Sequence, residues 1–541
     1  MGIPVYFSHI IKQYVDILKK IENKTFFDIL FLDANSIIYD VYYSIIKDHN
    51  NYLTKHLEEL IIKNTIEKIK EIINLFEIKK EIVICFDGVA PLSKLKQQRE
   101  RRFKTWIKSK IINSSQWNTC KITPGTKFME SLNKHLSIFE KQHNNVKILN
   151  SNYPGEGEQK IFDYLSHKYP NNNEKHVLME KNNLKICIYG LDSDLIMLSL
   201  LHSNFYNKIF LYRETPEFIK NLNKKLDYKE KYLLNIQNLN KHITNSLYIN
   251  PITEHYFKTN MNYIILFFLV GNDFVPHHPG LSLRLNGAET LIQLYKDFLQ
   301  ERDLFYILNN KFFIDWDSIK IIIRELAKKE QENIKDYHEY KSNIQKKIIK
   351  NDKIMKSKEE LLNFLPLFNT EDEQYILSNP ECMNERYYKK SFGCEYNIKN
   401  ICYHYLKNIE WNFFYYIGQD NECDLNYYYP YYHAPLFTDC IKYIPLKFET
   451  LYNKNKLENT YIHPATQLLY ILPSSYYNLI DDKIVNNIEF NNNEKFCELF
   501  KDPSNLVIDI DYNFVKYFFE SVIHFKFIDV QLLNNEVLKN I

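Results

Sequence analysis

Three short apolar runs in the first half of the chain each end on acidic residues. They are FDILFLDAN at 27–35, EIVICFDG at 81–88 and LKICIYGLDSD at 184–194. Each run is rich in Ile, Leu and Phe and is bounded by Gly or Asn, which is typical of a buried strand. Longer amphipathic patterns, such as the one at 57–76, lie between the runs and predict helices. The alternation predicts an α/β fold with a mostly parallel sheet flanked by helices.

The acids that end these runs are Asp33, Asp87, Asp192 and Asp194. The carboxyl ends of parallel strands meet at one edge of a sheet, so we expect the four side chains to converge there. Bringing like charges together is costly unless a cation lies between them. The pattern therefore predicts a metal site at this edge of the sheet.

Two other segments place acids where they can join the same edge. YPGEGEQKIFDYL carries Glu156 and Glu158 in a Gly-rich turn before an amphipathic pattern, and FFLVGNDFVP places Asp273 just after an apolar run. A single Asp after a strand is usually a turn or helix cap, but seven acids in one α/β region favour a common site. Oxygen ligands in that number suit Mg²⁺ or Mn²⁺. A pair of such ions is typical of phosphodiester hydrolysis.

One of the most basic segments of the chain follows directly after Asp87. Between residues 94 and 110 there are eight basic side chains and one acid. If the segment is helical, four polar side chains share one face and their donors can enclose one phosphate group. A solvated basic helix face is the alternative interpretation. The four residues are Lys94, Gln98, Arg101 and Arg102.

Length and composition indicate more than one domain. A chain of 541 residues is too long for one small core. We expect a catalytic region at 1–325, a charged helical connector at 326–385 and an aromatic-rich α+β region at 386–541 that packs on the first. The formal net charge is only +2, so any nucleic-acid-binding surface must be local.

The cysteines and the apolar runs indicate the cellular compartment, and they argue against a zinc site and a membrane helix. Nine cysteines without a CxxC pair argue for reduced thiols and hence for a cytoplasmic or nuclear rather than a secreted protein. Cys394, Cys402 and His404 match no zinc-finger spacing, so we assign no zinc. The longest apolar run, at 263–271, is far below the roughly 20 residues of a membrane helix, and we expect no membrane association.

Several long motifs resemble the XRN family of 5′→3′ exoribonucleases in order and in wording. They are FLDANSII, FDGVAPLSKLKQQRERRF, ITPGTKFM, PGEGEQKI, YGLDSDLIML and GNDFVP, and MGIP and YYYPYYHAP also look like that family. The resemblance implies a PIN or flap-nuclease-like catalytic core and a processive enzyme of mRNA decay that releases nucleoside 5′-monophosphates. It also implies that all seven acids bind metal, namely Asp33, Asp87, Glu156, Glu158, Asp192, Asp194 and Asp273.

The resemblance extends to the substrate-binding residues. It implies that Lys94, Gln98, Arg101 and Arg102 bind the 5′-terminal monophosphate and exclude a cap or a triphosphate. Family members hold the leading bases between a His and a Trp. Trp411 matches that Trp, and Tyr39 stands where the His is expected. We therefore expect two Mg²⁺ or Mn²⁺ ions, single-stranded RNA with a 5′-monophosphate as the partner, and cytoplasmic residence.

The sequence also departs from the family pattern. In CDLNYYYPYYHAP, the residues before the motif lack the tryptophans that the family has there. The chain also ends soon after its second conserved region. We interpret it as a minimal core enzyme from a large DNA virus or an AT-rich microbe.

Two other functions stay open. A flap or structure-specific DNA nuclease shares the acids and the basic helix, but it lacks the second aromatic region. A non-catalytic RNA-binding scaffold would gain nothing from grouped acids that repel RNA.

Overall fold

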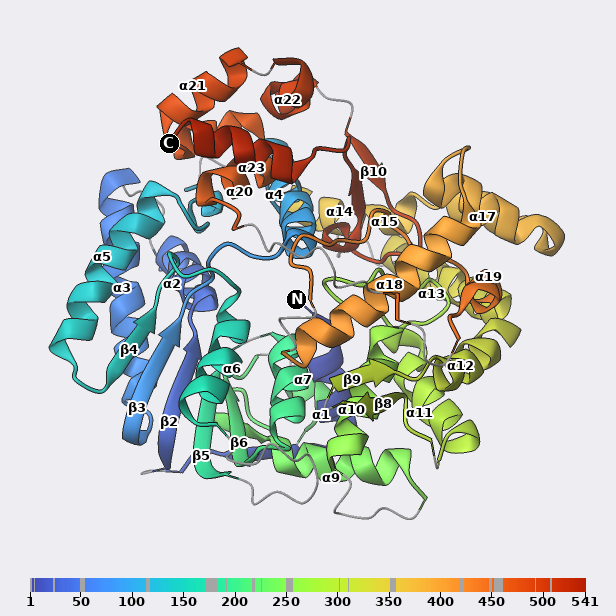
Figure 1. The fold of residues 1–541 in the computed structure, drawn as a ribbon, viewed down its shortest axis with the longest axis horizontal. Coiled ribbons are helices and arrows are strands. Elements are labelled where there is room, and N and C mark those ends of the chain that lie inside the picture. Colours follow the sequence, from blue (N-terminus) through green and yellow to red (C-terminus); the bar gives the residue numbers. More distant parts are fainter. Residues whose placement is uncertain are drawn as a thin grey trace.

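The computed structural model describes most of the chain (Figure 1). The residues outside the description are 1, 4, 23–24, 49–53, 113–116, 171–181, 191, 217–218, 225, 250–255, 301, 310, 351–356, 419–422, 447–449, 452–460, 492 and 506–507. All the site residues expected from the sequence lie within the described part. Part of the expected connector, 351–356, lies outside it.

A seven-stranded sheet forms the centre of the first region, with the order β1-β7-β6-β5-β2-β3-β4. The five strands from β6 to β4 are parallel, and β7 and β1 add an antiparallel edge. The three apolar runs of the sequence form β2, β3 and β5, which lie side by side. The strands are β1 (Leu18–Lys20), β2 (Phe26–Asp33), β3 (Glu77–Cys85), β4 (Val146–Leu149), β5 (Asn182–Tyr189), β6 (Tyr206–Arg213) and β7 (Tyr232–Asn235).

Helices cover both faces of this sheet (Figure 1). Alternating side chains of β2 enter two different cores, because successive residues of a strand point to opposite faces. Leu30 and Leu32 pack with α2, α3 and α5, whereas Ile29 and Phe31 pack toward α6, α7 and α10. These helices are α2 (Asn35–Asp48), α3 (Thr54–Ile73), α5 (Lys127–Gln142), α6 (Gly157–Lys168), α7 (Ser193–His202) and α10 (Tyr256–Phe268).

The remaining helices of the first region surround the sheet edge and α10. A small hairpin of β8 (Phe305–Leu308) and β9 (Lys311–Ile314) lies among them. The helices are α1 (Tyr6–Gln13), α4 (Leu92–Ile112), α8 (Ile219–Leu222), α9 (Ile236–Leu247), α11 (Gly287–Phe298) and α12 (Trp316–Lys328).

The second half of the chain is mostly helical and packs on the first. In Figure 1, α18 crosses the middle of the molecule and α20 to α23 lie over α4. One hairpin, β10 (Asp509–Asp511) with β11 (Val522–His524), completes this half. The helices are α13 (Glu330–Lys350), α14 (Lys358–Asn363), α15 (Leu365–Phe368), α16 (Glu371–Leu377), α17 (Met383–Phe392), α18 (Ile398–Tyr416), α19 (Phe437–Cys440), α20 (Pro464–Ile471), α21 (Asp482–Asn491), α22 (Asn493–Phe500) and α23 (Val530–Lys539).

The sequence predicted this architecture correctly: a mostly parallel α/β sheet with an aromatic-rich second region packed on it. The expected connector is helical in its described part, but it is anchored through buried charges. The ammonium of Lys341 in α13 donates a hydrogen bond to the carboxylate of Glu373 in α16, and both side chains are fully buried. The limits of the three regions stay predictions.

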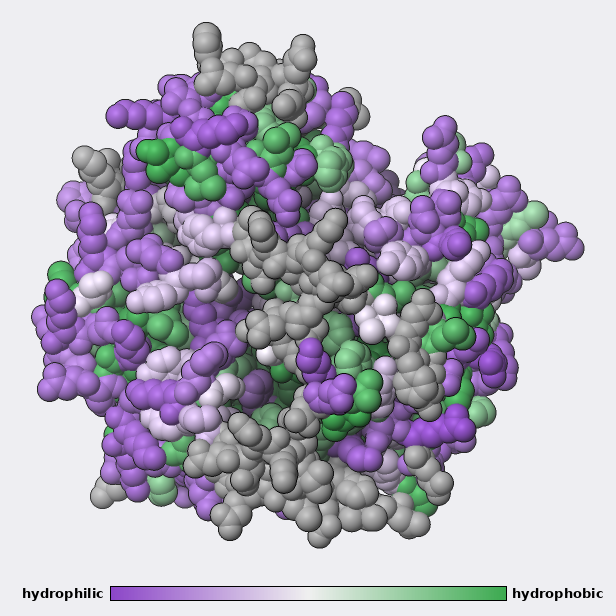
Figure 2. Space-filling view, viewed as in Figure 1, coloured by the Kyte–Doolittle hydropathy of each residue, from purple (hydrophilic) through white to green (hydrophobic). Residues whose placement is uncertain are grey.

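No helix in the described part of the chain is long and apolar enough to cross a bilayer. α10, which contains most of the longest apolar run, is buried against α7, α9 and α18 instead. Hydrophilic residues cover most of the face shown in Figure 2.

Candidate active site

The strand order brings the predicted acids together. β3 and β4 extend the sheet on one side of β2, and β5 and β6 extend it on the other, so the strand order reverses between the parallel strands β2 and β5. Ligands of open α/β sheets bind at the carboxyl ends of the strands at such a switch point. Asp33 is the last residue of β2, Asp87 follows β3 and Asp192 follows β5. These three acids therefore lie along one edge.

Four acids lie at the amino ends of two helices that start at this edge. Glu156 is the N-cap of α6 and Glu158 is in its first turn. Asp192 is the N-cap of α7, where its carboxylate accepts a hydrogen bond from the backbone NH of Asp194 at 3.3 Å. The positive end of each helix dipole stabilises these carboxylates. Asp192 therefore caps α7, and its position is also compatible with a role as a metal ligand.

Close packing at the start of α6 explains why residue 157 is a glycine. The NH of Gly157 donates a hydrogen bond to Asp87 Oδ1 at 2.8 Å. A Cβ atom at this position would lie 2.5 Å from Asp33 Oδ1, which is impossible without displacing that carboxylate. Asn35, which sequence reasoning missed, holds the other oxygen of Asp87 through a 2.5 Å hydrogen bond from its Nδ2. Its position two residues after Asp33 was the available signal.

A buried lysine compensates part of the negative charge. Lys94 Nζ lies 2.7 Å from Glu156 Oε1 and 2.7 Å from Asp273 Oδ2. Burial acts to lower the pKa of Lys94, but the carboxylates of Asp273 and Glu156 raise it well above its usual value. Burial likewise acts to raise the pKa of Asp273, and the ammonium of Lys94 instead holds it below its usual value. This ion pair is therefore charged.

Three of the other acids lie among like charges without sufficient compensation. Burial and the neighbouring carboxylates raise the pKa of Asp33, Glu158 and Asp194 well above the usual values. Oδ1 of Asp33 is buried without a hydrogen-bond partner among the described residues. Single carboxylate oxygens of Asp192, Asp194 and Asp273 lie within 4.8 Å of one another. A set of this kind fits divalent cations with oxygen ligands, because the cations would replace the missing positive charge.

The basic segment forms α4 as expected. Some of its basic side chains lie near the acids, and others contact the second region of the chain. Lys96 donates hydrogen bonds to the carbonyls of Tyr429 and Tyr431 at 3.0 and 2.5 Å. Arg99 lies over the rings of Tyr470 and Phe525, 4.9 and 4.3 Å from their centroids. This side of α4 holds the second region in place, a role that sequence reasoning missed.

The four residues assigned to the phosphate pocket have different environments. Lys94 lies among the acids, and Arg101 is exposed. Arg102 donates hydrogen bonds of 3.3 Å to the hydroxyl of Tyr39 and to the carbonyl of Ile122. Nε of Arg102 and Oε1 of Gln98 are buried without a partner in the described part of the chain. Arg102 and Tyr39 are thus brought together.

Trp411 is fully buried in α18. Its ring stacks on Tyr415 with centroids 5.1 Å apart, and its Nε1 donates a 2.8 Å hydrogen bond to the carbonyl of Asp424. The hydroxyl of Tyr415 donates a 3.0 Å hydrogen bond to Glu156 Oε2. Trp411 therefore supports the acid cluster through Tyr415, and base stacking by Trp411 stays a prediction.

A cavity of about 500 Å³ opens beside the acids, between α4 and the second region. Asp273 and Phe274 line it on one side, and Arg101 lines it from α4. The other wall contains tyrosines from the YYYPYY motif, among them Tyr428 and Tyr432. Positive charge with aromatic rings is the combination that single-stranded nucleic acids bind.

The geometry thus defines a protein with a carboxylate-rich site suited to divalent cations, as in metal-dependent nucleases, beside a basic, aromatic cavity. Sequence comparisons agree with this class. Residues 1–215 match the family described as XRN 5′-3′ exonuclease N-terminus, and residues 260–376 match the Xrn1 helical domain. The chain belongs to the XRN family, so the resemblance seen in the motifs is confirmed.

Curated relatives support the same assignment. The chain is 33% identical to 5′-3′ exoribonuclease 1 of Saccharomyces cerevisiae over 339 residues, which are 56% of this chain and 21% of the relative. It is 26% identical to 5′-3′ exoribonuclease 1 of Homo sapiens over 557 residues, covering 89% of this chain and 31% of the relative. With 5′-3′ exoribonuclease 2 of Arabidopsis thaliana the identity is 25%, covering 55% and 37%. The chain thus spans a fifth to two fifths of the length of these relatives.

Proposed function

We propose that this protein is a divalent-metal-dependent 5′→3′ exoribonuclease that degrades single-stranded RNA from a 5′-monophosphate end. The observation that carries the proposal is the meeting of the seven acids at the switch point of the sheet, beside α4 and the aromatic cavity. The family membership supports it, because the relatives named above are 5′-3′ exoribonucleases.

The acids would hold two Mg²⁺ or Mn²⁺ ions. Asp192, Asp194 and Asp273 offer oxygens close enough for one ion, and Asp33 and Asp87 meet on the other side of Gly157. When bound, such ions activate a water molecule and neutralise the charge on the leaving oxygen. The chain itself supplies the ligands, their orientation by Asn35 and Tyr415, and their partial charge compensation by Lys94.

End recognition would depend on the inner part of α4. Arg102 is half-buried and always charged, and its guanidinium offers more donors than its two hydrogen bonds use. A monophosphate next to Arg102 would accept a hydrogen bond from its unpartnered Nε, and the side-chain NH₂ of Gln98 would be a second donor. The tyrosines of the cavity would accept successive bases without regard to sequence, as a processive enzyme requires.

One experiment tests metal, direction and end together. A 3′-labelled RNA with a 5′-monophosphate, 5′-hydroxyl or 5′-triphosphate is incubated with the protein in Mg²⁺ and in EDTA. We expect loss of the monophosphate RNA alone, only in Mg²⁺, with mononucleotides as the product. Equal cleavage of all three ends, or internal fragments, would contradict the end pocket and favour an endonuclease.

Matched variants test metal-dependent cleavage and recognition of the 5′ end separately. Asp192→Asn should abolish cleavage of every substrate. Arg102→Met should remove the preference for the monophosphate, whereas Lys108→Ala on the outer side of the same helix should leave it intact, because Lys108 only forms a surface ion pair with Glu359. A DNA strand of the same sequence tests the flap-nuclease alternative, which requires that DNA be cut at least as fast as RNA.

A further inference from the structure

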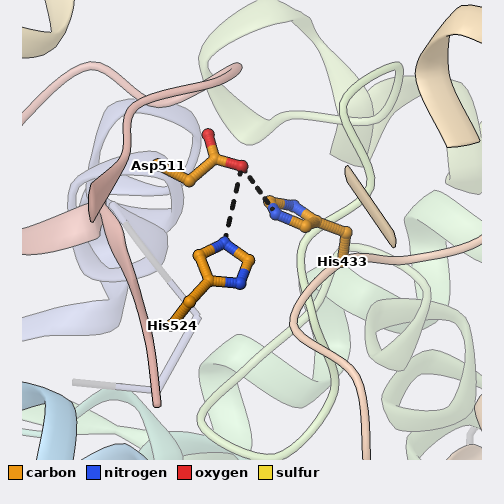
Figure 3. A group of neighbouring side chains, drawn as sticks. All are labelled: His433, Asp511 and His524. Atoms are coloured by element: carbon orange, nitrogen blue, oxygen red, sulfur yellow. Dashed lines mark ion pairs between the residues drawn. The ribbon is translucent and has the colours of Figure 1, made fainter. Parts of the chain in front are cut away.

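A second group of metal-binding side chains lies in the C-terminal half, apart from the seven acids. It consists of His433, Asp511 and His524 (Figure 3). His433 Nε2 lies 2.9 Å from Asp511 Oδ2, and His524 Nε2 lies 3.9 Å from the same oxygen. One ligand atom from each residue lies within 4.8 Å of the other two. One ring nitrogen of each imidazole thus lies close to the same carboxylate oxygen.

The register of the β10–β11 hairpin holds two of the three residues in position. Asp509 pairs with His524, and Asp511 pairs with Val522. Directly paired residues and residues two apart lie on the same face of an antiparallel ladder. Asp511 and His524 are therefore diagonal neighbours on one face. Asp511 Oδ1 accepts a 2.6 Å hydrogen bond from the backbone NH of Asn513, which leaves Oδ2 for the histidines.

The loop that carries His433 is fastened to the same hairpin. The hydroxyl of Tyr429 donates a 2.8 Å hydrogen bond to the carbonyl of His433. The hydroxyl of Tyr432 accepts a 3.0 Å hydrogen bond from the NH of Phe525, next to His524. Preorganised ligands of this kind lose little entropy when they bind an ion.

The ligand types and their spacing indicate the class of metal. Two imidazole nitrogens with one carboxylate are a ligand set of Zn²⁺ and similar ions, whereas Mg²⁺ prefers oxygens. Tetrahedral bonds of about 2.0–2.2 Å place ligand atoms roughly 3.3–3.5 Å apart. The distances of 2.9 and 3.9 Å bracket that range, so side-chain shifts of about half an ångström would admit the ion.

A cavity beside the group supplies a second, independent indication of a cation. Asp511 and His524 line a cavity of about 680 Å³ whose wall also carries Glu371, Asp372 and Asp509. One lysine, Lys390, lines it too and forms an ion pair with Asp372, so the acids of the wall outnumber the cations. Grouped acids attract cations into a hollow of this kind. The cavity also gives water access to Asp511 and His524, and a metal bound by three protein groups needs such access for its fourth ligand.

We propose that His433, Asp511 and His524 bind one divalent transition-metal ion of the Zn²⁺ type, separate from the ions at the seven acids. His433 and Val522 also line the 500 Å³ cavity next to Asp273. The ion would therefore fasten the β10–β11 hairpin to the YYYPYYHAP loop and stiffen the wall of that cavity. This site does not depend on the proposed nuclease activity.

Zinc binding by the 541-residue chain tests the proposal directly. The protein is stripped with EDTA, dialysed into millimolar Mg²⁺ to occupy the carboxylate site, and titrated with ZnCl₂ in a calorimeter. We expect one Zn²⁺ per chain. His524→Ala should weaken binding on the order of 100-fold or more, and it should fold because this side chain is 30% exposed. His135→Ala on the exposed surface of α5, and Asp192→Asn, are controls that should bind as the wild type does.

Cobalt gives a readout of the ligands themselves. Co²⁺ added to the same Mg²⁺-saturated protein should produce the visible absorption of a low-coordinate site with nitrogen ligands, and His433→Ala or His524→Ala should remove it. The proposal is overturned if the Mg²⁺-saturated wild type binds no Zn²⁺. It is equally overturned if binding survives in His524→Ala or is lost in Asp192→Asn.

Discussion

Replacement of Lys94 by methionine should destabilise the metal-free protein far more than the metal-bound one. The ammonium lies 2.7 Å from both Glu156 Oε1 and Asp273 Oδ2. The three side chains are 7%, 7% and 3% exposed, so water cannot take over the compensation. Methionine fills a similar volume, and the variant therefore isolates the loss of charge from the loss of packing.

The magnitude follows from this burial. Removing one partner of a buried ion pair costs about 3–5 kcal/mol, because the other charge stays buried without compensation. One ammonium serves two carboxylates here, so we expect the free energy of unfolding in EDTA to fall by about 3–5 kcal/mol. In Mg²⁺ the bound ions restore positive charge beside Asp273, and the loss should shrink to about 1–2 kcal/mol, the usual value of a lost charged hydrogen bond.

Urea unfolding in EDTA and in Mg²⁺ measures the loss in the free energy of unfolding under both conditions. Lys96→Met is the matched control on the same helix, because Lys96 is half-buried and donates hydrogen bonds only to the carbonyls of Tyr429 and Tyr431. Burial lowers the pKa of Lys96 to about 8, so its charge contributes less. The control should lose about 1–3 kcal/mol equally with and without metal. A loss in Lys94→Met that is the same in EDTA and in Mg²⁺ would refute the reasoning.

Four further variants test the site. Asp192→Asn should lower the rate of RNA cleavage at least about 1000-fold, because a lost metal ligand removes several kcal/mol of transition-state stabilisation, and a gel assay that finds normal cleavage would remove the metal assignment. Burial and its acidic neighbours raise the pKa of Asp194, so its contribution to stability is present below the unfolded pKa of about 3.9 and is lost as the pH rises through the raised value. Asp194→Asn should therefore stabilise the protein in EDTA by about 1–2 kcal/mol at pH 8 and not at pH 4, as urea midpoints would show. Gly157→Ala should weaken Mg²⁺-dependent cleavage about 10–100-fold, because its Cβ would lie 2.5 Å from Asp33 Oδ1 and displace that carboxylate. An activity assay with unchanged Mg²⁺ dependence would contradict this. Trp411→Ala should cost about 3–5 kcal/mol of stability as a buried residue, whereas a tryptophan that only stacks on RNA would cost little in unfolding experiments without RNA.

The sequence alone determined the sheet and the place of the acids. The runs that end at Asp33, Asp87 and Asp192 became neighbouring parallel strands, as their apolar, β-branched composition predicted. The carboxyl ends of such strands meet at one edge whatever the intervening sequence, so the convergence of these acids followed from the strand pattern. The helical face of the segment at 94–110 followed equally from local periodicity.

Only the tertiary structure decided which partners the polar side chains have. The assignment of Lys94 to a phosphate pocket stays a prediction, and its ammonium lies against Asp273, which is 179 residues away in the sequence. Trp411 was expected to meet RNA bases and is buried on Tyr415. His433, Asp511 and His524 carry no spacing that indicates a site, and a hairpin register brings two of them together. Helices and strands are encoded by the local pattern of apolar residues. The free energy of a buried charge depends instead on neighbouring groups from distant parts of the chain, which come close only in the folded protein.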